Sequence, residues 1–139
     1  MFVLDTNVVS ELRKPRESSP HPCLIQWADG VDASELFLSS ITVLELELGI
    51  LLLERKDSRQ ADTLRQWFEN RVLVEFDGRI LPVDEIVAKR CAQLHVPNPQ
   101  SERDAMIAAT ALVHGMTVVT RNVSDFKSSG VPLLNPWGN

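Results

Sequence analysis

Acidic side chains occur in this sequence at or just after the ends of apolar, strand-like segments. Asp5 directly follows the apolar run 2–4, and Asp125 comes soon after the run 116–120. The ligand crevice of an open α/β sheet lies beyond the carboxyl ends of its strands, so residues in these positions are the first candidates for chemistry. Each also has an ordinary structural explanation, because Asp5 suits a helix N-cap and Asp125 suits a turn.

Glu45 lies in the helix predicted after a second strand-like run. It shares a helical face with three apolar residues, Ile41, Leu48 and Leu52. Burying a carboxylate without a partner is costly, so Glu45 requires either a metal cation or an arginine from elsewhere in the fold. Glu47 is rotated by about 200° on the same helix, so only one of the two can enter a given cleft. We select Glu45 because it lies nearer the start of the helix and the carboxyl end of the strand.

Asp104 lies near the start of an alanine-rich helix. It follows Ser101 by three residues, which matches a capping box and gives Asp104 a structural explanation. It also shares a helical face with a mostly small-residue stripe, Ala108, Ala111 and Leu112. Small side chains let this helix approach the sheet closely, which would point the carboxylate inward. Both interpretations remain open at this stage.

Together these positions aim four acidic residues at one crevice, with Asn122 as the alternative to Asp125 in the last place. No cysteine or histidine ligand is predicted there. Carboxylate oxygens without nitrogen or sulfur ligands suit the hard, octahedral ions Mg²⁺ and Mn²⁺. Such ions activate a bound water and stabilise the charge that develops during phosphodiester cleavage. The acidic residues therefore indicate metal-dependent cleavage of a nucleic acid.

The charge balance is unfavourable for holding nucleic acid by bulk electrostatics. The chain contains 14 Lys and Arg and 19 Asp and Glu, giving a net charge of −5. Any nucleic-acid contact must therefore be local. Basic residues that could form a rim around the acidic crevice are Arg13, Lys14, Arg16, Arg121 and Lys127. Ordinary solvated surface charge explains each cluster equally well.

Cysteine usage and apolar segments favour a cytoplasmic protein. Cys23 and Cys91 stand far apart and form no CxxC pair, which fits small buried hydrophobes in a reducing compartment. The N-terminus shows no signal-peptide pattern. The apolar stretch 41–53 is interrupted by acidic residues and is too short to cross a bilayer, so we expect no membrane association and a buried core helix there.

Strand-like segments alternate with helical ones along the chain. Strands are predicted at 2–4, 36–38, 116–120 and 131–134, a loop at 14–22, and helices at 6–12, 23–28, 41–55, 58–70, 83–94 and 101–114. Such alternation predicts a parallel sheet covered on both faces. We expect one domain over residues 1–139, with a three-layer α/β/α architecture and a mostly parallel sheet of four to five strands.

Five segments of the sequence together resemble the PIN-domain ribonuclease toxins of bacterial toxin–antitoxin systems, the VapC/FitB family. The segments are LDTNVVSE at 4–11, SITVLELELG at 40–49, DAMIAATA at 104–111, TRNVSDF at 120–126 and NPW at 135–137. They occur in family order and span nearly the whole chain. The resemblance implies a PIN-like fold.

The resemblance also implies roles for individual residues. Asp5 and Asp104 would be the principal metal ligands, and Glu45 would complete the acidic site. Neighbours that would support these ligands by hydrogen bonds are Thr6, Asn7, Thr120 and Asn122. Family members carry the fourth acid at the place of either Asn122 or Asp125, and we favour Asp125.

The function implied by the resemblance is that of a type II toxin, a Mg²⁺-dependent endoribonuclease for which Mn²⁺ is an alternative ion. Its implied partners are RNA as substrate, a cognate antitoxin, and a second copy of the chain, in a homodimer that enters a toxin–antitoxin hetero-oligomer. Operator DNA would be bound only through the antitoxin. One alternative is a non-cleaving PIN module that binds nucleic acid, as in a FitB-like complex with DNA. Another is a Mg²⁺-dependent phosphoacceptor, but no lysine is placed at a strand end as that chemistry requires.

Overall fold

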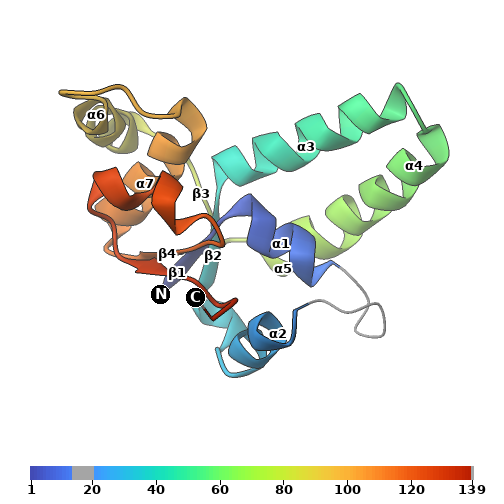
Figure 1. The fold of residues 1–139 in the computed structure, drawn as a ribbon. Helices are drawn as coiled ribbons and strands as arrows, with labels where there is room; N and C mark the ends of the chain where they lie inside the picture. The colour runs from blue at the N-terminus through green and yellow to red at the C-terminus, as the bar shows by residue number, and fades with distance from the viewer. Residues whose placement is uncertain (14–20, 139) are drawn as a thin grey trace.

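The structure is a computed structural model, and it describes residues 1–13 and 21–138. Its centre is a five-stranded sheet in which every neighbouring pair is parallel. The strands are β1 (Phe2–Leu4), β2 (Leu36–Ser39), β3 (Ile80–Leu81), β4 (Thr117–Val119) and β5 (Leu133–Leu134). Their order is β3-β2-β1-β4-β5, so β1 is the central strand (Figure 1). From β1 the chain adds β2 and β3 on one side and then crosses over to add β4 and β5 on the other.

Helices cover both faces of this sheet (Figure 1). They are α1 (Thr6–Leu12), α2 (Pro22–Asp29), α3 (Ser40–Glu54), α4 (Ser58–Trp67), α5 (Leu73–Glu75), α6 (Glu85–Leu94) and α7 (Glu102–His114). Alternate residues of each strand point to opposite faces. Leu4 and Val119 pack with α1, α2 and α3, whereas Val3 and Val118 pack with α7. The predicted three-layer α/β/α fold is therefore confirmed.

Most predicted elements are confirmed within one to three residues. β3 was not predicted, because a half-buried pair of residues is too short to show a strand pattern. The helix predicted to end at residue 70 instead continues through a π-helical turn, η3 (Phe68–Val72), into α5. The predicted loop 14–22 falls mostly outside the described residues, as do Lys14 and Arg16, and its last residue, Pro22, begins α2.

The prediction that α3 is a buried core helix is wrong. Its buried residues are Ile41, Thr42, Leu46 and Ile50. Leu44, Leu51 and Leu52 are 46%, 45% and 56% exposed, so Leu52 does not share a buried face with Ile41. The reason is that α3 and α4 form a helical hairpin that extends beyond the sheet, where only one side of α3 finds a partner (Figure 1).

The expectation for the cysteines is correct for one of them. Cys91 is buried against α7, but Cys23 is exposed at the start of α2. Both thiols are free. No helix in the described part of the chain combines the length and the apolar character needed to span a membrane.

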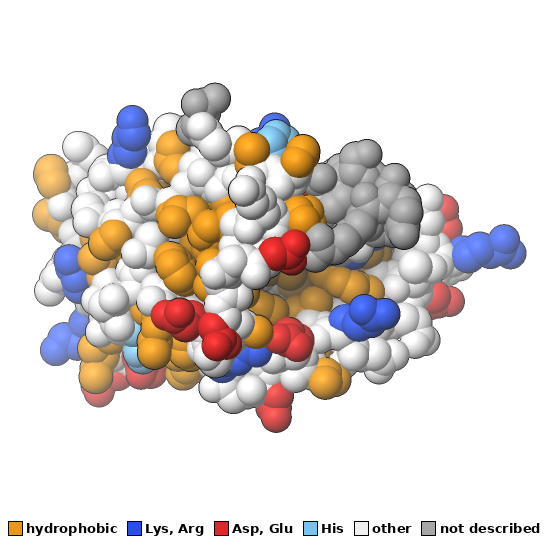
Figure 2. Space-filling view, turned by 90° about the horizontal axis from the view of Figure 1, so that it is seen from below, with side chains coloured by type: hydrophobic (Ala, Val, Ile, Leu, Met, Phe, Trp, Pro, Cys, Tyr) orange, Lys and Arg blue, Asp and Glu red, His pale blue; other side chains and the backbone are white. Residues whose placement is uncertain are grey.

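An apolar hollow of about 270 Å³ lies between α1 and the segment that follows α4. Leu4, Val9, Leu12, Val72 and Phe76 line it, and Arg13, Trp67, Arg71 and Glu75 complete its wall. Figure 2 shows the molecule from below, where hydrophobic side chains lie in a recess of the surface. Among the described residues, α1 and the segment after α4 thus leave a gap between them that reaches Leu4 of the central strand.

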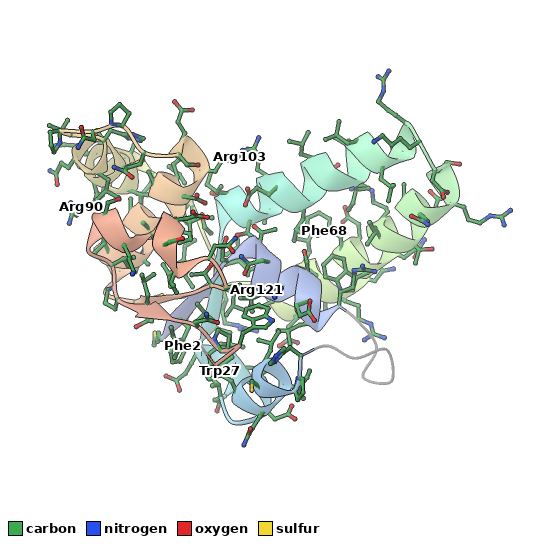
Figure 3. The ribbon with its side chains drawn as sticks, in the orientation of Figure 1. Phe2, Trp27, Phe68, Arg90, Arg103 and Arg121 are labelled. Carbon is green, nitrogen blue, oxygen red and sulfur yellow. The ribbon has the colours of Figure 1, made fainter. Side chains whose placement is uncertain are left out.

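Aromatic contacts hold α2 to the sheet. Phe2 of β1 meets Trp27 of α2 edge to face, with ring centroids 5.4 Å apart and ring planes at 87° (Figure 3). This geometry is favoured by the charge distribution of aromatic rings. Both rings pack against the cluster that contains Leu4 and Val119, so α2 belongs to the same hydrophobic core as the central strand.

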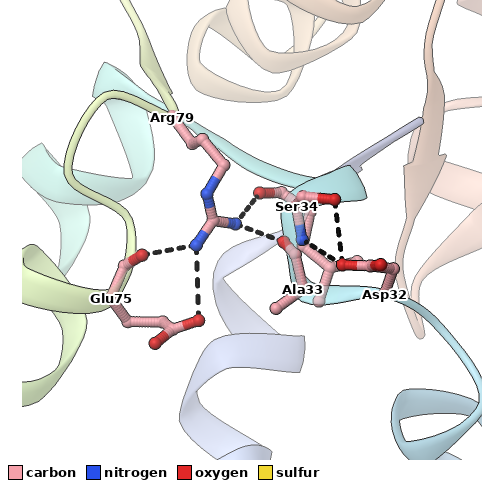
Figure 4. Close-up of polar contacts among 6 residues, drawn as sticks. Asp32, Ala33, Ser34, Glu75 and Arg79 are labelled. Atoms are coloured by element: carbon pink, nitrogen blue, oxygen red, sulfur yellow. Dashed lines mark hydrogen bonds and ion pairs between the residues drawn. The ribbon is translucent and has the colours of Figure 1, made fainter.

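Arg79 fastens the edge strand β3 at the amino-terminal end of the sheet. Its guanidinium donates hydrogen bonds to the carbonyl oxygens of Ala33, Leu36 and Glu75 (Figure 4). It also pairs with the Glu75 carboxylate at 3.3 Å and lies over the Phe76 ring. These bonds join the start of β2 to the chain that enters β3.

We predict that Arg79→Gln lowers the free energy of unfolding by about 1 to 3 kcal/mol, because several carbonyl oxygens lose a charged donor. Arg79→Lys should recover only part of this loss, since an ammonium group cannot reproduce the planar fork of the guanidinium. Urea unfolding measures both effects. The control is Arg59→Gln, at an exposed position of α4, which should change stability by less than about 0.5 kcal/mol. Equal stability of wild type and Arg79→Gln would contradict this role.

Candidate active site

Asp5 caps α1 at the carboxyl end of the central strand. Its Oδ1 accepts a hydrogen bond from the Thr6 backbone N–H at 2.8 Å. Its Oδ2 accepts hydrogen bonds from the Thr120 hydroxyl at 2.8 Å and from the Asn7 side-chain amide at 3.2 Å. Only 7% of Asp5 is exposed. Thus the capping role does not compete with a role in the site, because both follow from the strand-to-helix junction.

The position of Asp5 is the topological switch point of the sheet. Asp5 follows β1 and Thr120 follows β4, and these two strands are parallel neighbours. The strands that come after β1 in the chain, β2 and β3, lie on one side of this pair, whereas β5, which comes after β4, lies on the other. In open α/β sheets the crevice at such a point is where ligands bind. The hydrogen bond from Thr120 to Asp5 spans this crevice at its base.

Glu45 joins Asp5 from α3. Its Oε1 accepts a short hydrogen bond of 2.6 Å from the Thr6 hydroxyl, and its Oε2 lies 3.7 Å from Nη1 of Arg103. Glu47 instead forms a two-pronged ion pair with Arg65 of α4, with 2.8 Å between Nη2 and Oε2. Of the two glutamates, the structure thus places Glu45 beside the Asp5 junction. The structure also gives Glu45 an arginine partner, Arg103, which the sequence analysis had considered as the alternative to a metal cation.

Asp104 lies in the first turn of α7, partly buried and facing the other acids. The Ser101 hydroxyl makes no capping hydrogen bond to the helix backbone, so the capping box considered from the sequence is not completed. A side-chain hydrogen bond from Ser101 instead reaches the Asp104 carboxyl group. Asp104 thus stays beside its N-cap residue Ser101, and its carboxyl group is within electrostatic reach of Asp5, Asp125 and Glu45.

The pKa values of Asp5 and Asp104 reveal how close the acidic groups are. Burial is the main cause that raises the pKa of Asp5, and the charges of Glu45 and Asp125 raise it further, against hydrogen bonds from Thr120 and Thr6. Burial also raises the pKa of Asp104, followed by the charges of Asp5, Asp125 and Glu45. The charges of Glu45 and Asp125 therefore act on both Asp5 and Asp104, which places the four acids in one region of the fold.

The structure separates the two alternatives for the fourth acidic position. Asp125, in the short 3-10 turn η4 (Val123–Asp125), is exposed, yet its charge acts on both Asp5 and Asp104. Asn122 contributes its backbone N–H, which donates to the Thr120 hydroxyl at 3.0 Å. This arrangement agrees with Asp125 as the carboxylate, although the ligand roles of all four acids stay predictions.

The remaining predicted neighbours form a hydrogen-bond network around Asp5. Asn7 donates to Asp5, and its Oδ1 accepts from the backbone N–H of Arg121 at 3.3 Å. Thr120 is fully buried, and its hydroxyl donates to Asp5. Because these donors approach Asp5 from α1 and from the end of β4, they fix the direction of its carboxylate.

The donor set is suited to a hard divalent cation. All of its side chains present oxygen, and like charges in a partly buried space raise the pKa values of two of them, a repulsion that a cation would relieve. Within residues 1–13 and 21–138, no three His, Cys, Asp or Glu side chains lie close enough to hold an ion by themselves. Mg²⁺ commonly binds through one or two carboxylates and keeps several waters, so this spacing remains compatible with it.

Sequence analysis did not identify Arg103 as a neighbour of the site. Arg103 precedes Asp104, but its ion pair with Glu45 depends on the packing of α7 near α3, which a linear pattern does not reveal. Arg121 was noted as a possible basic rim residue, and its guanidinium lies over the Trp137 ring, 5.5 Å from the centroid. Arg13, from the same predicted rim, lies over Trp67 at 5.9 Å.

A second hollow, of about 250 Å³, lies between α1 and the α3–α4 hairpin. Thr6, Glu45, Arg13 and Trp67 are among the residues that line it. Gly49, Ile50 and Leu64 contribute to its walls. Of the site residues, Thr6 and Glu45 thus border this hollow, whereas Asp5, Asp104 and Asp125 do not line it.

Fold and site together define an α/β protein with an acidic, oxygen-only site at the switch point of a parallel sheet. A model of the PIN domain family matches residues 2–128. Toxin FitB of Neisseria gonorrhoeae is 38% identical to the chain over 142 residues, covering 99% of each. VapC ribonuclease Y4jK of Sinorhizobium fredii is 36% identical over 142 residues, covering 99% of this chain and 98% of the relative. The chain therefore belongs to the PIN domain family, and the resemblance to VapC/FitB toxins is confirmed.

Solved structures of toxin–antitoxin complexes have the same fold as this chain. The crystal structure of FitAcB from Neisseria gonorrhoeae matches with a TM-score of 0.89 and 38% identity, covering 100% of both chains. A structure of FitAB bound to an IR36 DNA fragment matches with a TM-score of 0.88 and 38% identity, covering 100% of this chain and 97% of the other. A toxin–antitoxin complex from Klebsiella pneumoniae matches with a TM-score of 0.68 and 26% identity over 98% of each chain.

The raised pKa of Asp104 predicts a pH-dependent effect of Asp104→Asn. A carboxyl group whose pKa is higher in the folded protein destabilises the fold when ionised, and this effect is absent in acid and complete above the folded pKa. In EDTA, Asp104→Asn should therefore melt with wild type in acid and at a higher temperature near neutral pH. Thermal melts across this range measure the difference.

The matched control is Asp62→Asn, at an exposed position of α4, whose melting temperature should follow wild type at every pH. If Asp104 were only a helix-capping residue, the substitution would lower the melting temperature at neutral pH by an amount equivalent to about 1 kcal/mol.

Proposed function

We propose that this chain is the toxin component of a type II toxin–antitoxin system and acts as a Mg²⁺-dependent endoribonuclease, with Mn²⁺ as an alternative ion. The observation that carries the proposal is the gathering of four acidic side chains near the switch point, where the charges of Glu45 and Asp125 act on both Asp5 and Asp104. The relative Y4jK is a VapC ribonuclease by name, which supports RNA as the substrate. We further propose that residues 1–139 form a single PIN domain that acts in the cytoplasm.

Asp5, Asp104 and Glu45 would hold the cation, with Asp125 completing the acidic site. A bound divalent cation supplies charge neutralisation and lowers the pKa of a water that can attack phosphorus. Hydrogen bonds from Thr120 and Thr6 lower the pKa of Asp5 against the effect of burial, and together with Asn7 they fix the direction of its carboxylate. Thr6 also holds Glu45 through its hydroxyl, so one residue couples two of the acids. Side chains that are oriented in advance need no rearrangement when charge develops on the phosphate.

A second function is supported by the FitAB structure bound to DNA. In this alternative the chain serves mainly within an antitoxin complex that binds nucleic acid without cleaving it. The two functions differ in their need for the carboxylates, because binding through a partner would tolerate neutral side chains at Asp5 and Asp104.

We predict that Asp5→Asn and Asp104→Asn each reduce RNA cleavage at least about 100-fold, because each removes a charged oxygen ligand while nearly preserving volume. EDTA should abolish wild-type cleavage, and Mg²⁺ or Mn²⁺ should restore it. Cleavage of labelled RNA by purified protein measures both effects. Asp62→Asn is the control and should retain wild-type activity.

Each outcome of this assay distinguishes the two functions. Undiminished cleavage by Asp104→Asn, or robust cleavage in EDTA, would overturn the proposed metal site. Absence of cleavage under every condition, together with DNA binding by the chain and its antitoxin, would support the non-cleaving alternative.

We also predict the assembly and the biological effect of the toxin. Expressed alone, the chain should form a homodimer and arrest growth, and co-expression of its cognate antitoxin should restore growth by forming a hetero-oligomer. Binding to operator DNA should require the antitoxin, because the toxin alone carries a net charge of −5. Light scattering and growth curves are the measurements. A monomer at micromolar concentration, or harmless expression of an RNA-cleaving protein, would contradict this assembly.

A further inference from the structure

The acidic site creates an electrostatic problem for the substrate of the proposed function. RNA carries a negative charge at every phosphate, and the crevice holds four carboxylates on a chain whose net charge is −5. A cation at the site would neutralise part of this charge locally. Phosphates on either side of the cleaved bond would still need positive partners. Two arginines beside the site, Arg103 and Arg121, have no role in the proposed metal site.

Arg103 lies on the α7 side of the crevice. It occupies the first turn of α7, where the helix dipole disfavours a positive charge, so helix electrostatics do not account for it. Its Nη1 lies 3.7 Å from Oε2 of Glu45, which is too long for a good hydrogen bond. The Arg103 side chain is 47% exposed, and an ion pair with this exposure stabilises little. The guanidinium therefore keeps N–H donors that another anion can use.

Arg121 lies on the β4 side of the crevice, immediately after Thr120. Its backbone N–H donates to Asn7, which ties this residue to the Asp5 network. Its guanidinium lies over the ring of Trp137, itself packed against the hydrophobic core. Stacking orders the planar guanidinium while leaving the N–H groups at its edge available for a phosphate. Arg121 is thus held in place before any substrate arrives.

The two arginines come from opposite sides of the site. In Figure 3 they lie on the two sides of α1, whose N-cap is Asp5. Arg103 lies beside Glu45, and Arg121 is bonded through its backbone to Asn7, a hydrogen-bond partner of Asp5, so each arginine borders a different part of the acidic site. We infer that Arg103 and Arg121 bind phosphates of the RNA strand on the two sides of the acidic site. This inference rests on the proposed function, whose substrate it takes to be RNA.

A purely structural role for these residues makes different predictions. Arg103 could serve only to pair with Glu45, and Arg121 only to hold Trp137. Removing either would then change stability but not the dependence of RNA binding on salt. A phosphate contact, in contrast, releases counterions when it forms, so its loss lowers the salt dependence of binding.

The experiment measures binding of a fluorescent single-stranded RNA of mixed sequence in Mg²⁺ over a series of salt concentrations. The Asp5→Asn protein is the background, so that cleavage does not interfere. Adding Arg103→Gln or Arg121→Gln should each weaken binding several-fold and reduce the slope of log K against log salt by about 0.7, the value for one phosphate contact on a single strand. The double substitution should reduce the slope by about twice as much.

Conservative variants and a remote control keep this test independent of folding. Arg103→Lys and Arg121→Lys retain the charge, so they should keep the salt slope while binding less tightly than arginine. Arg90→Gln lies on α6, far from the site in Figure 3, and should leave both affinity and slope unchanged. Melting curves identify any glutamine variant that fails to fold. At that position the affinity and salt slope of the lysine variant are then compared with those of the Asp5→Asn background.

Three outcomes would overturn the inference. The affinity and the salt slope could be unchanged in both glutamine variants, Arg90→Gln could have an equal effect, or the Asp5→Asn background could bind no RNA. The proposed function is tested separately by cleavage. If cleavage requires the carboxylates but the salt dependence of RNA binding is the same with and without the two arginines, the proposed function stands and the phosphate contacts of the arginines are refuted. If RNA binding depends on the arginines but the wild-type protein cleaves no RNA, the phosphate contacts are supported and the proposed nuclease function is refuted.

Discussion

The repulsion among carboxylates at the switch point is the constraint on which the rest of the site depends. Asp5 is almost fully buried, and Glu45 and Asp125 add negative charge that raises its pKa. A carboxylate in this position would be protonated or displaced without compensating donors. Thr120 and Thr6 supply those donors from two different elements. The site therefore exists only where β1, β4 and α1 meet.

The parallel sheet provides this meeting point at little cost, because its neighbouring strands end at the same edge. Two buried alanines of α7, Ala108 and Ala111, pack in the same cluster as Val3 and Val118 of the sheet, and this close packing brings Asp104 to the same edge. At the opposite end, Arg79 satisfies carbonyl oxygens where β2 begins. Polar groups that stabilise the fold and polar groups that could act on a substrate are thus separated along the strands.

The α3–α4 hairpin has a different relation to the core. Glu45 lies near its base, where α3 contacts α1, but Leu51 and Leu52 lie toward its exposed end. A single helix therefore contributes to the acidic site at one end and leaves apolar side chains uncovered at the other. Hydrophobicity alone suggested burial throughout, because a sequence does not reveal whether an apolar face has a partner.

The sequence by itself determined the alternation of strands and helices, the cap at Asp5, and the acids that follow the strand ends, because each depends on residues close in the chain. Only the tertiary structure decided which side chains meet. The sequence favoured Glu45 over Glu47, but the hydrogen bond of Glu45 with Thr6, its ion pair with Arg103, and the effect of the Asp125 charge on Asp5 and Asp104 appear only in the folded chain. Helix orientation sets these pairings through packing, and the short strand β3, the exposed Cys23 and the uncovered Leu52 escaped prediction for the same reason. Burial and contact are properties of elements far apart in sequence, so no local pattern encodes them.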